Sequence, residues 1–248
     1  YQRVTDYRTN QIQQLPNVNV FLENKLQSKD VLGLGFDHVV TATGSSWELS
    51  ILDEHFVPQP IEKQEGVFTP DDFMDSKLQS PVVIYDFDYY YMGGLIAEYI
   101  SDLGHEVTII TPFENVSPWS FMSNEVNAIK AKMYEKNIKT ITEYRISEFK
   151  NDSLTLTHKI TKEIMDVDRK SLVIVGMRLP VDSLFKELSA NQSLLEDSGI
   201  KTLNNIGDSN SPGAVFHAVY AGHMYANTFD SGIDDDPYDF KFEYPVIQ

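Results

Sequence analysis

The clearest hydrophobic pattern in the chain lies at residues 82–112, VVIYDFDYYYMGGLIAEYISDLGHEVTIITP. An apolar run of strand length is followed by a turn, a stretch with helical periodicity, a second turn and another apolar run. Continuous apolar runs of this length are typical of strands buried on both faces of a parallel sheet. The pattern therefore predicts a strand–helix–strand unit, the building block of dinucleotide-binding α/β domains.

Weaker patterns predict the elements on either side of this unit. Helices are expected at 1–15, 124–136, 182–188 and 213–229, with a further helix start at 69–72. Strands are expected at 18–23, 37–42, 139–147, 153–158, 162–167 and 172–175. The first helix should stop before Pro16, because proline cannot continue a helix. Strands that alternate with helices indicate an α/β protein with parallel sheets.

The order of these elements predicts two domains, one inserted into the other. Residues 77–169 contain their own strand–helix–strand start and their own later strands, so we expect them to form the inserted domain. Residues 1–76 and 170–248 would then pair to form the other. The chain begins at Tyr1 on an amphipathic helix instead of a strand and glycine turn, so we expect the later part of a longer polypeptide.

Composition narrows the function classes. The formal net charge is -17, from 37 acidic and 20 basic residues, which argues against nucleic acid as a partner because phosphates need a basic face. No apolar run approaches the ~20 residues that span a bilayer, so we expect no membrane segment. The absence of cysteine excludes thiolate metal sites within this chain. A signal-peptide pattern is lacking, which favours the cytoplasm.

The turn of the strand–helix–strand unit does not suit a dinucleotide. The pyrophosphate-binding pattern G-x-G-x-x-G needs glycines there, so that backbone N–H groups can approach the phosphates. This chain instead has Asp86-Phe87-Asp88-Tyr89-Tyr90-Tyr91, and only Gly93 and Gly94 remain, where glycine serves helix–strand packing. Two aspartates would repel a phosphate. The fold looks nucleotide-binding, whereas this copy of the site looks closed.

Two short motifs flank that unit. Ala42-Thr43-Gly44 ends a buried strand, and Gly207-Asp208 ends another before the last helix. In flavoproteins with two dinucleotide domains, A-T-G marks the crossover between the domains, and its glycine lets backbone approach the cofactor. The aspartate of G-D bonds a ribityl or ribose hydroxyl or orders water at the pyrophosphate, and the next helix points its N-terminus at phosphate. Each motif alone is weak, but together they predict a flavoprotein-disulfide-reductase-like fold.

Longer sequence segments make the resemblance specific to one protein family. The segments YQRVTDYRTNQIQQLPNVNVFLENKL, GFDHVVTATGSSW, VFTPDDFMDS, NVSPWSFMSNEVNAI, VGMRLPVDSLF and IGDSNSPGAVFHAVYAGHMYAN stand in one order along the chain. Together with the turn at 86–91, they resemble the C-terminal half of the trimethylamine, dimethylamine and histamine dehydrogenase family. The resemblance runs from Tyr1 to about Phe229.

The resemblance implies an α/β fold of two Rossmann-like domains, FAD/NAD(P)-binding in type, the first without its initial βαβ element. In the family, an N-terminal barrel holds FMN, the amine site and a cysteine-ligated [4Fe-4S] cluster, none of which this chain contains. ADP would bind in this portion where related reductases hold FAD, and FAD itself stays open as the alternative. The implied partners are the barrel portion of the same enzyme, an electron-transferring flavoprotein and a second copy in a homodimer.

The resemblance also assigns cofactor-binding residues. Ala42, Thr43 and Gly44 match the segment that passes near the nucleotide. Gly207 and Asp208 match the pyrophosphate side, with Ala214 and Val215 at the helix N-terminus behind it. No catalytic residue and no metal ligand is expected, and the fragment alone should have no turnover.

Two other functions stay open. An NAD(P)H-dependent flavin oxidoreductase of the 2,4-dienoyl-CoA reductase type would need the glycine turn that 86–91 lacks. A stand-alone non-catalytic binding module would suit a chain without a barrel. The tyrosines at 89–91 are expected to pack the turn rather than relay electrons, because aromatic side chains supply large burial area. Asp234–Asp236 are expected to form a solvated tail rather than a cation site.

Overall fold

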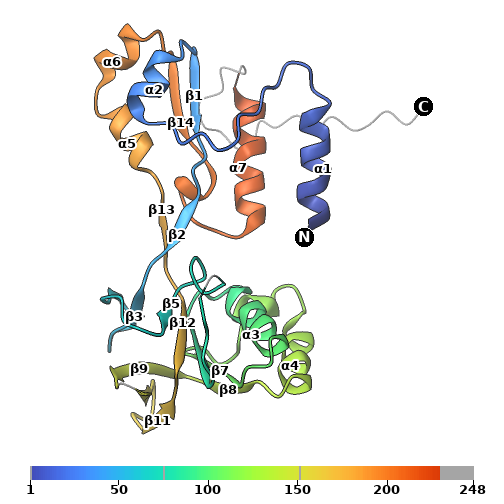
Figure 1. Cartoon of the computed structure of the whole chain (residues 1–248), viewed down its shortest axis with the longest axis vertical. Helices are drawn as coiled ribbons and strands as arrows, with labels where there is room; N and C mark the ends of the chain where they lie inside the picture. The colour runs from blue at the N-terminus through green and yellow to red at the C-terminus, as the bar shows by residue number, and fades with distance from the viewer. Residues whose placement is uncertain (1, 75, 151, 230–248) are drawn as a thin grey trace, which may run out of the picture. The chain divides into compact units, whose positions relative to one another are not determined.

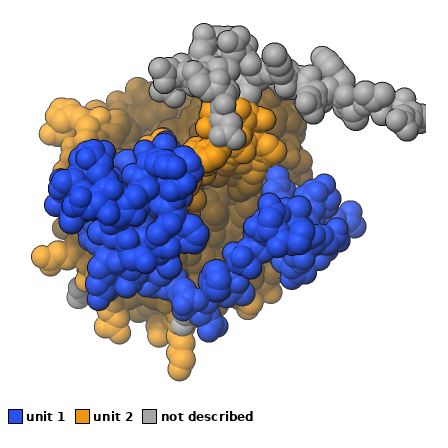
Figure 2. Space-filling model, turned by 90° about the horizontal axis from the view of Figure 1, so that it is seen from above, with its two compact units in different colours: residues 1–39, 183–204 blue, residues 40–182, 205–248 orange. Residues whose placement is uncertain are grey.

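The computed structural model describes residues 2–74, 76–150 and 152–229 (Figure 1). The acidic tail, including Asp234–Asp236, lies outside the described residues. The chain forms two compact units (Figure 2). The smaller comprises residues 1–39 and 183–204, and the larger comprises residues 40–182 and 205–248. The helices and strands are α1 (Gln2–Gln13), α2 (Ser28–Gly33), β1 (His38–Thr41), β2 (Ser45–Trp47), β3 (Ser50–Leu52), β4 (Pro58–Pro60), β5 (Val67–Phe68), β6 (Val82–Asp86), α3 (Met92–Asp102), β7 (Val107–Thr111), η1 (Pro118–Phe121), α4 (Val126–Glu135), β8 (Lys139–Thr142), β9 (Tyr144–Phe149), β10 (Ser153–His158), β11 (Ile164–Asp168), β12 (Ser171–Val175), β13 (Arg178–Pro180), α5 (Ser183–Ser189), α6 (Gln192–Asp197), β14 (Thr202–Asn205), η2 (Gly207–Ser209) and α7 (Val215–Thr228).

A five-stranded parallel sheet forms the centre of the larger unit, in the order β5-β12-β6-β7-β8. Every residue of β6, β7 and β12 is buried, as expected for strands covered on both faces. Helices α3 and α4 pack on one face of this sheet through Ile96, Ile100 and Met133. The antiparallel sheet β11-β10-β9 packs on the other through Ile146 and Leu156. The expected α/β class with a parallel sheet is confirmed.

The smaller unit has a modest core of its own. Val31 from α2, Leu188 from α5, Leu195 from α6 and Ile200 form its buried cluster. Strands β1 and β14 pair with each other. Domain boundaries at 77 and 169 stay a prediction; strands β5 and β12 of the parallel sheet lie just outside that range.

Some sequence-based expectations about local structure were wrong. Residues 18–23 are not a strand: none of the described strands pairs with them, and Phe21 and Leu22 are more than three-quarters exposed. No helix follows Thr69, although its backbone N–H donates to the Asp72 carboxylate as a helix cap would. The strand expected at 139–147 is two strands, because Glu143 has a positive φ of 66°.

Candidate functional site

The Ala42–Gly44 segment leaves β1 in an accessible turn. Ala42 and Thr43 are exposed, and Gly44 has a φ of 78°, which glycine adopts at no steric cost. The Gly44 carbonyl accepts a hydrogen bond from the Val181 N–H at 2.9 Å, and the Thr43 hydroxyl donates to the Val181 carbonyl. The turn is therefore anchored on one side and open on the other.

The structure brings Gly207-Asp208 beside this segment. The Ile206 N–H donates to the Thr41 carbonyl at 3.0 Å, which joins the ends of the two strands. Gly207 has a positive φ of 64°. Asp208 Oδ2 accepts a hydrogen bond from the Ser45 hydroxyl at 3.1 Å, directly after the A-T-G turn. Two motifs about 160 residues apart in sequence thus share one hydrogen-bonded site.

The start of α7 is capped by the protein's own side chains. The Gly213 N–H donates to Asp208 Oδ1 at 3.2 Å, and the Ala214 N–H donates to His217 Nδ1 at 3.0 Å. Because a backbone N–H can only donate, Nδ1 of this imidazole is the acceptor. Val215 follows, 65% exposed. At the N-terminus of α7, the backbone N–H groups of residues 213 and 214 therefore already donate hydrogen bonds to side chains of the protein.

Arg178 is a residue of this site that sequence reasoning missed. It lies on β13, opposite Trp47 of β2, and its guanidinium stands 5.0 Å from the centre of the Trp47 ring. Nη1 donates to the Gly213 carbonyl at 2.7 Å and to Asp208 Oδ2 at 3.4 Å. Nη2 lies 3.6 Å from Asp88 Oδ1. An arginine three residues after a buried strand was the available signal, but no site motif included it.

The turn at 86–91 is filled from within. A Cβ added to Gly93 would lie 2.2 Å from Cγ of Asp86, so the Asp86 carboxyl occupies the space that this glycine leaves. A Cβ added to Gly176 would lie 2.0 Å from the Phe87 ring. Side chains of the turn itself thus fill the space beside two glycines, where a pyrophosphate would otherwise approach the backbone.

The electrostatics of the turn agree with this closure. Asp86 is fully buried, and burial raises its pKa to about 8, with the nearby charge of Asp88 acting in the same direction. Its Oδ1 accepts a hydrogen bond from the Asp88 N–H at 3.1 Å. Burial also raises the pKa of Asp88, while the charge of Arg178 opposes that change. Burial thus favours the neutral form of Asp86, whereas Arg178 favours the charged form of Asp88.

Aromatic side chains pack the rest of the turn, as expected for the Tyr89–Tyr91 run. The rings of Tyr90 and Tyr91 lie 5.8 and 6.1 Å from that of Trp119. Trp119 in turn stacks on Phe216, in the first turn of α7, at 5.9 Å. Tyr90 and Tyr91 therefore pack the turn against Trp119.

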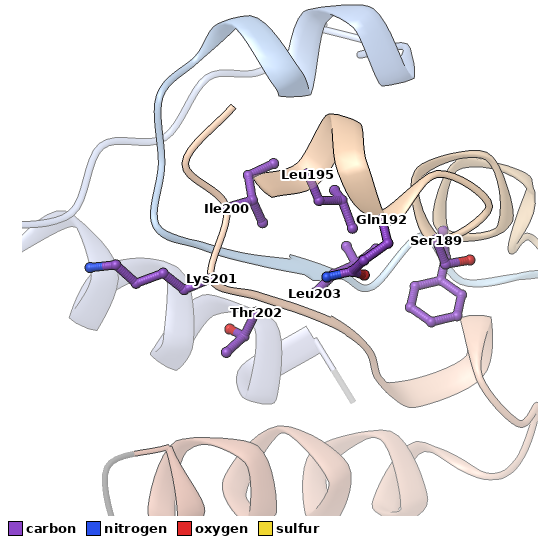
Figure 3. Close-up of a pocket in the computed structure, with 8 residues that line it drawn as sticks. Ser189, Gln192, Leu195, Ile200, Lys201, Thr202 and Leu203 are labelled. Carbon is purple, nitrogen blue, oxygen red and sulfur yellow. The ribbon is translucent and has the colours of Figure 1, made fainter. Parts of the chain in front are cut away.

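A small pocket lies elsewhere, in the smaller unit (Figure 3). It has a volume of about 160 Å³ and is lined by Phe185, Ser189, Gln192, Leu195, Ile200, Lys201, Thr202 and Leu203. Lys201, its charged residue, forms an ion pair with Asp37 at 3.1 Å. The pocket contains none of the motif residues, and we do not assign it a ligand.

The described part of the chain contains no group of three or more His, Asp or Glu side chains placed to hold a metal ion. Over those same residues, no helix is both long and apolar enough to cross a bilayer.

Comparison with known proteins gives a consistent set of relatives. Residues 68–166 match the family model described as the OYE-like second alpha/beta domain. Dimethylamine dehydrogenase from Hyphomicrobium sp. (strain x) is 26% identical over 94% of the chain. The structure of histamine dehydrogenase from Rhizobium sp. 4-9 superposes with a TM-score of 0.87 at 34% identity over 99% of the chain. The chain is a homologue of these amine dehydrogenases.

The homology covers only part of each relative. The chain spans 35% of the length of the dimethylamine dehydrogenase and 38% of that of the histamine dehydrogenase. The 6-hydroxypseudooxynicotine amine oxidase from Pseudomonas geniculata N1 superposes at a TM-score of 0.82 and 30% identity, over 90% of this chain and 33% of its own. The family resemblance expected from the sequence is confirmed, and the chain matches a portion of larger oxidoreductases.

A flavoprotein disulfide reductase from Escherichia coli shares the fold. It superposes with a TM-score of 0.52 at 16% identity, over 78% of this chain and 44% of its own. At that identity the likeness concerns architecture alone. The two proteins share a mixed α/β fold.

Proposed function

We propose that this chain is the nucleotide-binding, C-terminal portion of an amine dehydrogenase and that it binds ADP at Ala42–Gly44 and Gly207–Asp208. The observation that carries the proposal is the hydrogen-bonded junction of these two motifs through Asp208 and Ser45. In the proposed arrangement, two Rossmann-like halves (1–76 with 170–248, and 77–169) share the chain. The first half lacks its initial βαβ element, and Ala214 and Val215 lie at the phosphate side.

The contacts of Asp208 favour ADP over FAD. Its carboxylate already accepts hydrogen bonds from the Ser45 hydroxyl and the Gly213 N–H, and Arg178 approaches at 3.4 Å. A carboxylate has about four acceptor positions, so three of them are engaged by the protein. FAD extends beyond ADP by riboflavin, that is, by an isoalloxazine ring and a ribityl chain whose hydroxyls would need this aspartate. ADP has no ribityl chain, so it does not need a further hydrogen bond to Asp208.

The complete enzyme would oxidise a small amine at FMN and pass electrons through a [4Fe-4S] cluster to an electron-transferring flavoprotein. This chain has no cysteine, so the cluster ligands would belong to the barrel portion. In this proposal the chain supplies nucleotide binding and subunit stability within a cytoplasmic homodimer, and by itself it has no turnover.

The closed turn argues against the second candidate, an NAD(P)H-dependent flavin oxidoreductase. The Asp86 carboxyl fills the space beside Gly93, and the Phe87 ring fills that beside Gly176. A dinucleotide would have to displace both side chains. The third candidate is a stand-alone binding module. It would have the same ADP site but would not be part of an enzyme.

Calorimetric titration of the chain with ADP, FAD and NADPH tests the proposal. We expect saturable binding of ADP, weaker binding of FAD and none of NADPH. Asp208→Asn should reduce ADP affinity about tenfold, since it removes a charged acceptor from the junction. The control Glu106→Gln, which breaks only an exposed ion pair with Lys139, should bind as the parent does. Binding of NADPH without ADP would favour the reductase instead.

A further inference from the structure

Arg178 connects two parts of the molecule whose sequences carry unrelated motifs. One of its nitrogens contacts Asp208 and the Gly213 carbonyl, and the other faces Asp88 in the closed turn. The side chains of Arg178, Asp88 and Asp208 are 16%, 6% and 22% exposed, so water screens their charges little. All of these residues belong to the larger compact unit.

We propose that Asp88 and Arg178 are positioning residues for the ADP site, so that the closed turn supports the neighbouring nucleotide motif. The inference rests on the proposed function, which it deepens. Asp88 has no role in binding a second dinucleotide, and it instead holds the guanidinium that fixes Asp208 and the start of α7.

The chemistry of arginine explains why this residue can do so. The planar guanidinium presents donors in a rigid fork, so its two ends can face two carboxylates at once. The Trp47 ring below it and the short bond to the Gly213 carbonyl restrict its remaining freedom. Removal of Asp88 would leave the guanidinium partly buried with one fewer counter-charge, and its position over Asp208 would relax.

Asp88 is the carboxylate of the turn that faces Arg178, at 3.6 Å from Nη2. Asp86 points instead into the space beside Gly93, where burial favours its neutral form by raising its pKa to about 8. On the opposite end of the guanidinium, Asp208 is the carboxylate that faces Arg178. The bridge Asp88–Arg178–Asp208 therefore depends on one charged residue from each of three separate segments.

ADP affinity of three variants and a control tests the inference. We expect Asp88→Asn to weaken ADP binding about fivefold although Asp88 does not reach the nucleotide motifs. Arg178→Met should weaken it more, and Arg178→Lys should recover only part of the loss because an ammonium lacks the fork. The double variant Asp88→Asn/Arg178→Met should bind no worse than Arg178→Met alone, since Asp88 acts through Arg178. Glu106→Gln serves as the exposed-carboxylate control.

Amide hydrogen exchange at residues 213–217 supplies a readout that needs no nucleotide. Asp88→Asn and Arg178→Met should both accelerate exchange there, and Glu106→Gln should not. Unchanged exchange in folded Asp88→Asn would overturn the inference whether or not ADP binds. Equal ADP affinity of Asp88→Asn and the parent would overturn it as well. Absence of ADP binding by the parent would instead remove the proposed function and leave the exchange result to decide the bridge.

Discussion

The turns that follow strands β1 and β6 have opposite characters in this molecule. After β1, the turn at 42–44 is accessible, and a Cβ on Gly44 would meet nothing within 4 Å. After β6, the turn at 86–91 is closed, and a Cβ on Gly93 would collide with a buried carboxyl. Glycine serves backbone conformation in the first region and close packing in the second. A retained glycine therefore does not by itself indicate a retained ligand site.

The largest expected effect comes from filling the closed turn. Gly93→Ala should destabilise the protein by about 3 kcal/mol or more, because the new methyl overlaps the Asp86 carboxyl and overpacking of a core is costly. Urea unfolding measures the change. Gly222→Ala on α7, where a Cβ meets nothing within 4 Å, is the matched control and should be neutral or stabilising.

A second-site change tests the cause of that loss. Asp86→Gly combined with Gly93→Ala removes the colliding side chain and should recover part of the stability. If the double variant is no more stable than Gly93→Ala alone, the overlap with Asp86 is not the reason for the destabilisation.

The next effect concerns the pH dependence of the same turn. Burial raises the pKa of Asp86 in the folded protein from its ordinary value of 3.8 to about 8, so the folded state retains a proton that the unfolded state releases. Its contribution to stability is therefore complete below pH ~4 and is lost as the pH rises toward ~8. Asp86→Asn keeps the acceptor for the Asp88 N–H but cannot ionise. We expect the variant to gain on the parent by up to about 1.4 kcal/mol for each pH unit between pH 5 and pH 8.

Unfolding curves at several pH values measure this difference, and the variant-minus-parent comparison cancels the other titrating groups. A difference that stays constant between pH 5 and pH 8 would show that Asp86 is ionised in the folded protein at both.

A smaller effect is expected in the open turn. Gly44→Ala meets no atom, but its φ of 78° is unfavourable for a residue with a Cβ, so we expect a loss of about 1 kcal/mol. Thermal unfolding measures it. A loss as large as that of Gly93→Ala would abolish the distinction between the two turns.

The smallest effect belongs to the junction of the two motifs. Ser45→Ala removes one hydrogen bond to Asp208, and we expect a loss of about 0.5–1 kcal/mol in the free energy of ADP binding, with little change in unfolding. Calorimetry with ADP checks this. Ser46→Ala, on the exposed neighbouring position of β2, is the control.

Expectations from sequence held best where local pattern and burial agree. Strands β6, β7 and β12 are continuous apolar runs and lie buried in a parallel sheet, and α3 has the expected apolar face toward it. They held worst where apolar residues have no partner, as at 18–23, because a strand needs a neighbour to satisfy its backbone.

Local periodicity and residue types were enough to predict the α/β class, the position of the glycine-poor turn and the two motifs. Three contacts depend instead on how separate elements pack: Asp86 fills the space beside Gly93, His217 caps α7, and Arg178 joins Asp88 to Asp208. These contacts join residues whose distances depend on the packing of separate elements. No local pattern encodes such distances, so the closure of one turn and the support of the other became visible only in the folded chain.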